Sequence, residues 1–185
     1  QRAAAAWAAG KFDNELVPVS VPQKKGDPIV FKADEGVRAD ATAASLGQLK
    51  AIEKGGVVTA GNASQQNDAA AACLVVAEDK LEELGLGPIG WFTGWAAAGC
   101  EPSRMGIGPV PAVERLFART GLSWKDIDLV ELNEAFAAQG LAVLRQLGID
   151  DQDPRVNPNG GAIALGHPLG MSGARLVTTA MYQLH

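Results

Sequence analysis

The sequence predicts an α/β fold with a mainly parallel or mixed sheet. Short apolar runs rich in valine and isoleucine, typical of buried strands, alternate along the chain with segments whose apolar residues recur at helical spacing. Turns rich in glycine, proline and asparagine separate the two kinds of segment. With 185 residues and 47% hydrophobic composition, the chain is large and apolar enough for one domain or a domain and a half.

Helical spacing and helix-ending residues identify the expected helices. An Ala-rich helix ends near residue 9, where Gly10 suits its C-terminal cap. Pro111 suits the first turn of a later helix, and Ser172 can cap the last one. In chain order, helices are expected at 1–9, 43–52, 78–87, 111–121, 133–147 and 172–185.

Strands are expected where short apolar runs lie between turns. Pro18 and Pro22 confine the first strand to a sheet edge, and the polar residues 23–40 that follow it predict an exposed loop. Residues 69–77 have no clear period, so a buried helix competes there; the adjacent valines and the short length favour a strand. The expected strands are 15–21, 57–60, 69–77, 89–95 and 127–132.

Charge and hydropathy exclude several classes of partner. The net charge of -5 and the pI near 5.0 provide no basic patch for a nucleic acid. No apolar run is long enough for a membrane span, and no signal-like segment opens the chain. We therefore expect no nucleic-acid or membrane partner and a cytoplasmic protein, with an organelle as the alternative location.

The cysteine count and the chain ends lead to two further expectations. Cys73 and Cys100 are too few for a disulfide framework or a zinc site, and only His167 and His185 are available to assist them, so no metal site is expected. The chain starts with Gln1 inside a helical pattern and stops inside another, so we expect a fragment of a longer protein.

Asn133 is the first of two candidate functional residues. It follows the apolar run 127–132 and opens a helical pattern. Side chains at such a junction point into the crevice where open α/β sheets bind ligands. Capping of the helix by Asn133 is an equally good interpretation on the residues alone.

His167 is the second candidate. It lies in a loop with five glycines between residues 160 and 173, and Pro168 favours an extended backbone at the histidine. Histidine titrates near neutral pH and is the commonest general base, which makes this imidazole a catalytic candidate. A core or capping histidine is the alternative interpretation.

Four segments of the chain resemble the second half of thiolases, and they occur in that family's order. They are TAGNAS at Thr59–Ser64 followed by Asn67 and Asp68, MGIGPVPA at Met105–Ala112, NEAFA at Asn133–Ala137, and NPNGGAIALGHPLGMSGAR at Asn157–Arg175. The resemblance implies a thiolase-like α/β fold, with most of the C-terminal core domain and part of the loop domain. It divides the chain into the rear of the CoA-covering loop domain (1–66), the last elements of the N-terminal domain (67–87) and a C-terminal domain lacking its final strands (88–185).

The resemblance also implies an acyltransferase reaction between acetyl-CoA plus acyl-CoA and 3-ketoacyl-CoA plus CoA, with acetyl-CoA C-acetyltransferase as the expected activity. His167 matches the histidine that takes the proton of a nucleophilic cysteine and donates a hydrogen bond to the thioester oxygen. Asn133 matches the asparagine that holds a water in the oxyanion hole. A neighbouring histidine lowers the effective pKa of a thiol, which is a nucleophile only as the thiolate.

Coenzyme A thioesters are the implied substrates, and no permanently bound cofactor is expected. By resemblance, Ser64 lies near the pantetheine arm, with Phe136 and Ala135 beside it, while Arg38 and Ile52 lie near the nucleotide end. The residues alone also permit a turn serine at Ser64, a core aromatic at Phe136 and a solvated charge at Arg38.

Both catalytic cysteines of the family are expected outside this chain, so residues 1–185 alone are expected to be inactive. Cys73 is interpreted as a buried structural thiol and Cys100 as an ordinary loop residue. A homodimer or homotetramer is expected for the full-length protein. A degradative 3-ketoacyl-CoA thiolase and a noncatalytic CoA- or lipid-binding relative are the alternatives; a ketoacyl synthase is disfavoured, because that family has a histidine where Asn133 stands.

Overall fold

The computed structural model describes all of residues 1–185 and contains helices, one small sheet and long irregular segments. The sheet is a single antiparallel pair of strands. The elements in chain order are α1 (Arg2–Ala8), β1 (Val19–Val21), β2 (Ile29–Phe31), α2 (Ala43–Gly47), η1 (Glu78–Lys80), α3 (Leu81–Leu84), η2 (Pro102–Ile107), α4 (Pro109–Thr120), η3 (Trp124–Asp126), α5 (Ala137–Gln146), α6 (Ala162–Leu165) and α7 (Leu169–Leu184).

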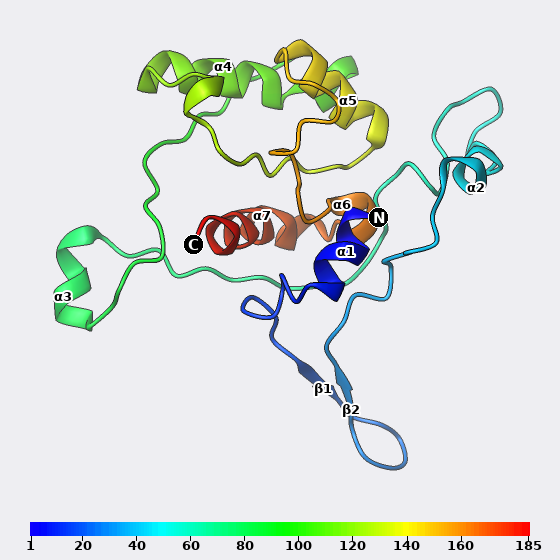
Figure 1. The fold of residues 1–185 in the computed structure, drawn as a ribbon, viewed down its shortest axis with the longest axis horizontal. Helices are drawn as coiled ribbons and strands as arrows, with labels where there is room; N and C mark the ends of the chain where they lie inside the picture. The colour runs from blue at the N-terminus through cyan, green and yellow to red at the C-terminus, as the bar shows by residue number, and fades with distance from the viewer.

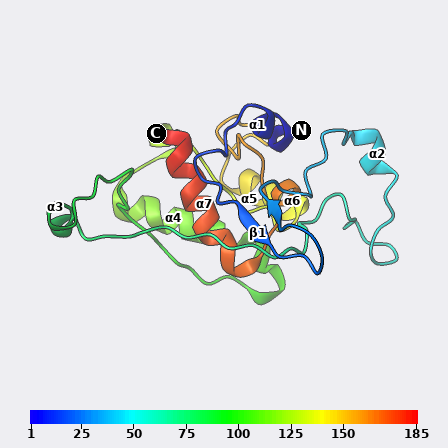
Figure 2. The same cartoon turned by 90° about the horizontal axis from the view of Figure 1, so that it is seen from below.

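The helices form two groups that are joined by extended chain. Figure 1 shows α4 packed beside α5 in one group and α6, α7 and α1 in the other. The β1–β2 hairpin projects away from both groups, and α2 and α3 lie at opposite ends of the molecule, as Figure 2 also shows. None of these helices is both long and apolar enough to span a membrane.

The largest packed cluster lies where α5 meets the segments on either side of it. Leu144, Ile149 and Val156 are buried together, and partly buried apolar side chains from 124–132 pack against them. Only 18 of the 185 residues are buried, and many large apolar side chains, such as Val75 and Phe92, are exposed. The buried core therefore lies in the C-terminal half of the chain. Residues 43–100 contain only the short α2, η1 and α3 and are otherwise irregular.

Four expected strands are absent, which corrects the strand prediction for 57–60, 69–77, 89–95 and 127–132. A strand is stabilised by hydrogen bonds to a neighbouring strand, and these segments find no such neighbour among residues 1–185. Only isolated bridges occur, between Ala51 and Thr59 and between Val130 and Val156. Cys73, which was expected to be buried, is exposed for the same reason.

The hairpin corrects a second expectation. The strand expected at 15–21 is present as the shorter β1, but its partner β2 lies inside the predicted loop 23–40. Val19 pairs with Phe31 and Val21 with Ile29, and every residue of the two strands is exposed. Three apolar residues after Pro28 are too short a run to distinguish a strand from a loop by pattern alone.

The sequence predicts the helix end at Gly121 correctly, but it predicts helix starts less accurately. Gly121 adopts φ +73° and ends α4 as expected, but α4 begins at Pro109 rather than Pro111. Residues 78–87 contain only the short η1 and α3, and the helix expected to reach residue 52 ends at Gly47. The helix expected from residue 133 begins at Ala137, so Asn133 is no helix cap.

Candidate functional site

His167 and Asn133 face each other across the gap between α7 and the segment before α5. The Nδ2 atom of Asn133 lies 3.1 Å from Nε2 of His167. With the Asn133 N–H as the donor, Nε2 is the accepting nitrogen of the imidazole, and Nδ1 is the one that faces Ser172. The imidazole is half-buried. Its accepting nitrogen is therefore the one that faces Asn133.

Ser172 fixes the other side of the ring. Its Oγ lies 2.6 Å from His167 Nδ1 and donates to the carbonyl of Pro168 at 3.0 Å. The hydroxyl proton is thus used on Pro168, and the oxygen is left to accept from Nδ1–H. Ser172 was expected to cap the last helix, but Pro168 occupies the N-cap position and Ser172 is buried in the first turn. The helix start thereby holds the imidazole.

The backbone of His167 is tied to a distant loop. Its N–H donates to Oδ1 of Asn67 at 3.2 Å. Gly166 has φ +99°, and a Cβ added there would collide with the side-chain amide of Asn67. Only glycine combines this backbone conformation with this close approach. Asn67 follows the TAGNAS segment (Thr59–Ser64), and its contact with His167 was not predicted from the sequence.

A backbone bridge brings three of the expected CoA-binding residues together. Ala63 pairs with Phe136, and the Ser64 N–H donates to the Ala135 carbonyl at 2.9 Å. The Ala137 N–H donates to the Asn62 carbonyl at 2.8 Å. This pairing keeps 135–136 extended, which is why α5 starts later than expected.

Phe136 is exposed, which corrects the alternative interpretation that it is a core aromatic. Its exposed fraction is 45%. Because its backbone pairs with Ala63, the ring projects from a fixed position on the surface. An aromatic held in this way offers an apolar contact to a ligand that spans Ser64 and Ala135.

Gln65 is a contact that the sequence did not predict. Its side-chain Nε2 lies 3.3 Å from the Gly36 carbonyl, 3.1 Å from that of Ile163 and 3.2 Å from that of Ala164. The side chain therefore links the loop before α2 to α6. A glutamine in a polar turn carries no sequence signal that identifies such distant carbonyls.

Arg38 and Ile52 are not brought to this site. Arg38 is exposed, and its guanidinium makes no hydrogen bond or ion pair within the chain. Ile52 is 70% exposed and lines a shallow pocket of about 320 Å³ with Glu53, Gly56, Val57 and Val58. Neither Asn133 nor His167 lines that pocket.

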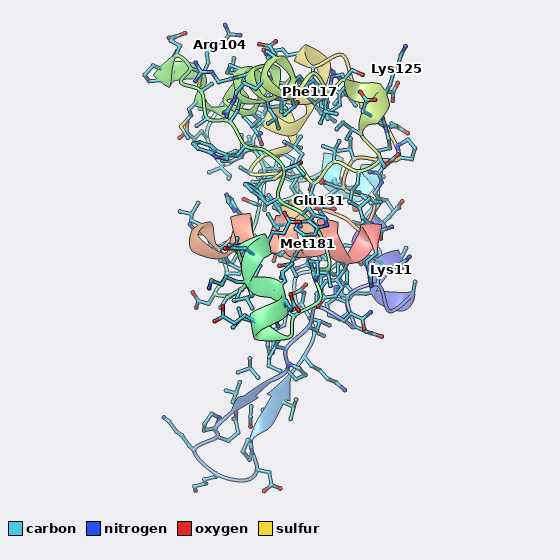
Figure 3. All side chains as sticks on the ribbon, turned by 90° about the vertical axis from the view of Figure 1, so that its left-hand side faces the viewer. Lys11, Arg104, Phe117, Lys125, Glu131 and Met181 are labelled. Carbon is cyan, nitrogen blue, oxygen red and sulfur yellow. The ribbon has the colours of Figure 1, made fainter.

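A buried ion pair joins Glu131, two residues before Asn133, to Arg175 on α7. Figure 3 shows Glu131 beside α7, and its Oε2 accepts from Arg175 Nη1 at 3.2 Å. Burial raises the pKa of Glu131 to about 7, because loss of hydration outweighs the attraction of Arg175. Glu131 Oε1 and two further nitrogens of Arg175 are buried without a partner. Nothing in the sequence pattern indicated this pair.

Comparison with known families gives matches over nearly the whole chain. The family model described as "Thiolase, N-terminal domain" matches residues 1–79, and the one described as "Thiolase, C-terminal domain" matches residues 86–185. The "Acetyl-CoA acetyltransferase" of Chromobacterium violaceum is 53% identical over 185 residues, which are 100% of this chain and 47% of the relative. The "Beta-ketoadipyl-CoA thiolase" of Pseudomonas putida is 55% identical over 185 residues and is covered to 46%.

Solved structures share the fold of this chain. The acetyl-CoA acetyltransferase of Bacillus anthracis superimposes with a TM-score of 0.93 at 42% identity, over 99% of this chain and 46% of that one. Human mitochondrial 3-ketoacyl-CoA thiolase in complex with CoA gives 0.86 at 42% identity, over 100% and 45%. The chain thus spans about half the length of the curated relatives it matches. The predicted thiolase-like fold is confirmed, although these residues form only the β1–β2 pair and not the expected parallel or mixed sheet.

Proposed function

The chain belongs to the thiolase family, and on that premise we propose that it supplies the base and an oxyanion-site residue of a CoA-dependent acyltransferase. The observation that carries the proposal is the pairing of His167 with Asn133. One imidazole nitrogen lies 2.6 Å from Ser172 Oγ, and the other lies 3.1 Å from the Asn133 amide. A fixed imidazole with an accepting Nε2 is suited to remove a proton from a thiol.

The proposed reaction starts with a cysteine contributed from outside residues 1–185. His167 Nε2 takes its proton, and the thiolate attacks the carbonyl carbon of an acyl-CoA. The C–S bond to CoA then breaks, and CoA leaves as a thiol with the proton that His167 returns. A base removes a proton from the α-carbon of a second thioester, and the resulting carbanion attacks the acyl carbon and releases the cysteine thiolate. In the reverse direction the thiolate attacks the keto carbon of a 3-ketoacyl-CoA, the C–C bond breaks, the departing acetyl-CoA carbanion takes a proton, and the acyl group on the cysteine passes to CoA.

Asn133 has a proposed role that follows from its contact with His167. Once Nε2 is protonated, two donors face each other, and the Asn133 amide must find another acceptor. A water or the developing oxyanion meets that need. Donors aimed at an oxyanion contribute on the order of 10²–10³ in rate. Proton transfer to His167 is therefore coupled to the release of an oxyanion donor.

The proposed substrates are coenzyme A thioesters, bound along Ser64, Ala135 and Phe136. Arg38 and Ile52 are proposed for the nucleotide end of CoA, which requires the exposed segments that carry them to approach the bound ligand. The favoured activity is acetyl-CoA C-acetyltransferase without a permanently bound cofactor. A homodimer or homotetramer in the cytoplasm completes the proposal.

A degradative thiolase acting on larger 3-ketoacyl-CoA substrates is the second candidate function. The 55% identity to a relative named "Beta-ketoadipyl-CoA thiolase" favours it. Comparing kcat/KM for acetoacetyl-CoA and for longer or dicarboxylic 3-ketoacyl-CoA esters separates the two. CoA binding without any thiolysis would instead identify a noncatalytic relative.

The test uses the complete protein with His167→Ala and Asn133→Ala, and with His185→Ala as the matched histidine control. Cysteine acylation by acetyl-CoA is followed by mass spectrometry, and thiolysis of acetoacetyl-CoA by absorbance. We expect His167→Ala to abolish acylation and His185→Ala to leave it unchanged. For Asn133→Ala we expect a decrease in kcat on the order of 10². Near-normal acylation in His167→Ala would remove this histidine from the mechanism.

A further inference from the structure

Asn157 has a positive φ angle, and its buried side-chain amide makes three hydrogen bonds. It is 2% exposed and adopts φ +44°, the only positive φ outside glycine in the chain. The following residue, Pro158, makes that conformation still less favourable. Asparagine adopts a positive φ more readily than other non-glycine residues, so this backbone position favours asparagine.

The side chain of Asn157 binds both neighbours of Asn133. Its Oδ1 accepts from the Leu132 N–H at 2.8 Å, and its Nδ2 donates to the Leu132 carbonyl at 2.8 Å. The same Nδ2 donates to Glu134 Oε1 at 2.9 Å. One amide therefore restrains the chain immediately before and after Asn133.

These contacts continue a short parallel bridge. The Val130 N–H donates to the Arg155 carbonyl, and the Asn157 N–H donates to the Val130 carbonyl, both at 2.9 Å. Beyond this point the backbone of 157–160 turns away. The side-chain amide of Asn157 then takes the place of a peptide group opposite Leu132, so the hydrogen-bonded ladder extends to the residue before Asn133.

Glu134 is confined on its other side as well. Its Oε2 accepts from the Ile163 N–H at 3.4 Å, in the first turn of α6. A Cβ added at Gly161 would collide with the Glu134 carboxylate. Asn133 itself has a single side-chain hydrogen bond, to His167, and its Oδ1 has no partner. The orientation of Asn133 thus depends on how its two neighbours are held.

We propose that Asn157 is a positioning residue that holds Leu132 and Glu134 so that the Asn133 amide faces His167. The inference rests on the proposed function, because its effect is exerted through the Asn133–His167 pair. A misplacement of about 1 Å at such a pair costs on the order of 10² in rate. The side-chain hydrogen bonds of Asn157 go to Leu132 and Glu134, and none goes to the imidazole or to Ser64.

The experiment removes the side chain in the complete protein and measures acetoacetyl-CoA thiolysis. Asn157→Gly is the primary variant, because glycine accepts φ +44° without strain. We expect kcat to fall about 10- to 100-fold, with KM changed less than about threefold. Asn159→Ala is the matched control: Asn159 is 7% exposed but binds Gln183 on α7 instead. Its kcat should stay within about twofold of wild type.

A double-mutant cycle separates positioning from general loosening of the fold. If Asn157 acts through Asn133, Asn157→Gly should slow an Asn133→Ala enzyme by less than about twofold. Additive losses would overturn the inference. So would an Asn157→Gly enzyme as fast as wild type when Asn133→Ala is slow. If Asn133→Ala itself is as fast as wild type, the proposed function fails and the inference fails with it.

A compensating pair keeps the inference testable if Asn157→Gly does not fold. Asn157→Asp places a carboxylate against both Glu134 and the Leu132 carbonyl and should lower kcat about tenfold or more. Adding Glu134→Gln restores a donor across the first of these contacts and should recover kcat in part, by at least about threefold. Failure of Glu134→Gln to rescue Asn157→Asp, in a protein of wild-type thermal stability, would overturn the inference.

Discussion

Ser172 Oγ lies 2.6 Å from His167 Nδ1, and it lies five residues further along the chain. The same oxygen donates its proton to the Pro168 carbonyl at 3.0 Å, so it accepts from the ring. This geometry selects the tautomer in which Nε2 is free. The start of α7 therefore determines which nitrogen of the imidazole can act as a base.

Replacing Ser172 tests that relationship. Ser172→Ala removes the acceptor for Nδ1–H, so both tautomers and several ring orientations become accessible. We expect kcat to fall on the order of tenfold, the rate equivalent of one hydrogen bond of about 1.4 kcal/mol. Thr178→Ala is the control, because Thr178 also donates to a carbonyl four residues earlier on α7 without touching the site. Equal rates for the two variants would contradict the role of Ser172.

Gly166 provides a test of the close approach between His167 and Asn67. In Gly166→Ala the new Cβ would displace the Asn67 amide and strain a backbone at φ +99°. We expect a loss of about 1–3 kcal/mol in the free energy of unfolding and a marked decrease in cysteine acylation. Gly170→Ala is the control: it lies in α7, and an added Cβ would meet no atom within 4 Å. Chemical denaturation that finds both variants equally stable would refute this prediction.

The buried Glu131 predicts a pH dependence of stability. Burial raises its pKa from 4.5 to about 7, despite Arg175. Between these values the folded protein binds more protons than the unfolded chain, so this contribution is fully present below pH 4.5 and is lost as pH rises through 7. At 1.36 kcal/mol per pH unit, the loss amounts to about 3 kcal/mol.

Urea unfolding of the complete protein between pH 4.5 and 8 measures this effect against Glu131→Gln. We expect the stability of the wild type relative to the variant to decline as pH rises across that interval. Glu114→Gln, at an exposed site on α4, should leave the pH dependence of the wild type unchanged. Parallel curves for the wild type and Glu131→Gln would show that the carboxylate is not responsible.

Residues 1–185 by themselves are predicted to be partly unfolded or aggregated. Val75, Phe92 and Trp95 are 79%, 72% and 63% exposed on segments without strand neighbours. Unpaired strand edges with apolar side chains associate readily. Strong binding of a hydrophobic dye and a broad thermal transition are expected. A monomer in sedimentation with a single cooperative transition would contradict the prediction.

The sequence alone indicated the helices whose ends carry a local signal. Gly121 ends α4 because an αL residue terminates a helix wherever it occurs, and such signals act within a few residues. The motifs that contain Asn133 and His167 were likewise visible as residue strings, as was their resemblance to thiolases. The family and the fold class that this resemblance implied were confirmed by the comparisons.

Tertiary structure decided what depends on partners distant in the chain. The segments 69–77 and 89–95 have strand-like composition, yet they form no strands, because a strand requires a neighbouring backbone and residues 1–185 supply none. The opposite applies at the site: Asn67 and Asn157 had no assigned role, and Ser172 was expected only to cap a helix, until folding brought their side chains against His167 and the chain around Asn133. Local pattern determines where a helix ends, whereas a hydrogen bond across the fold exists only once both partners have been placed.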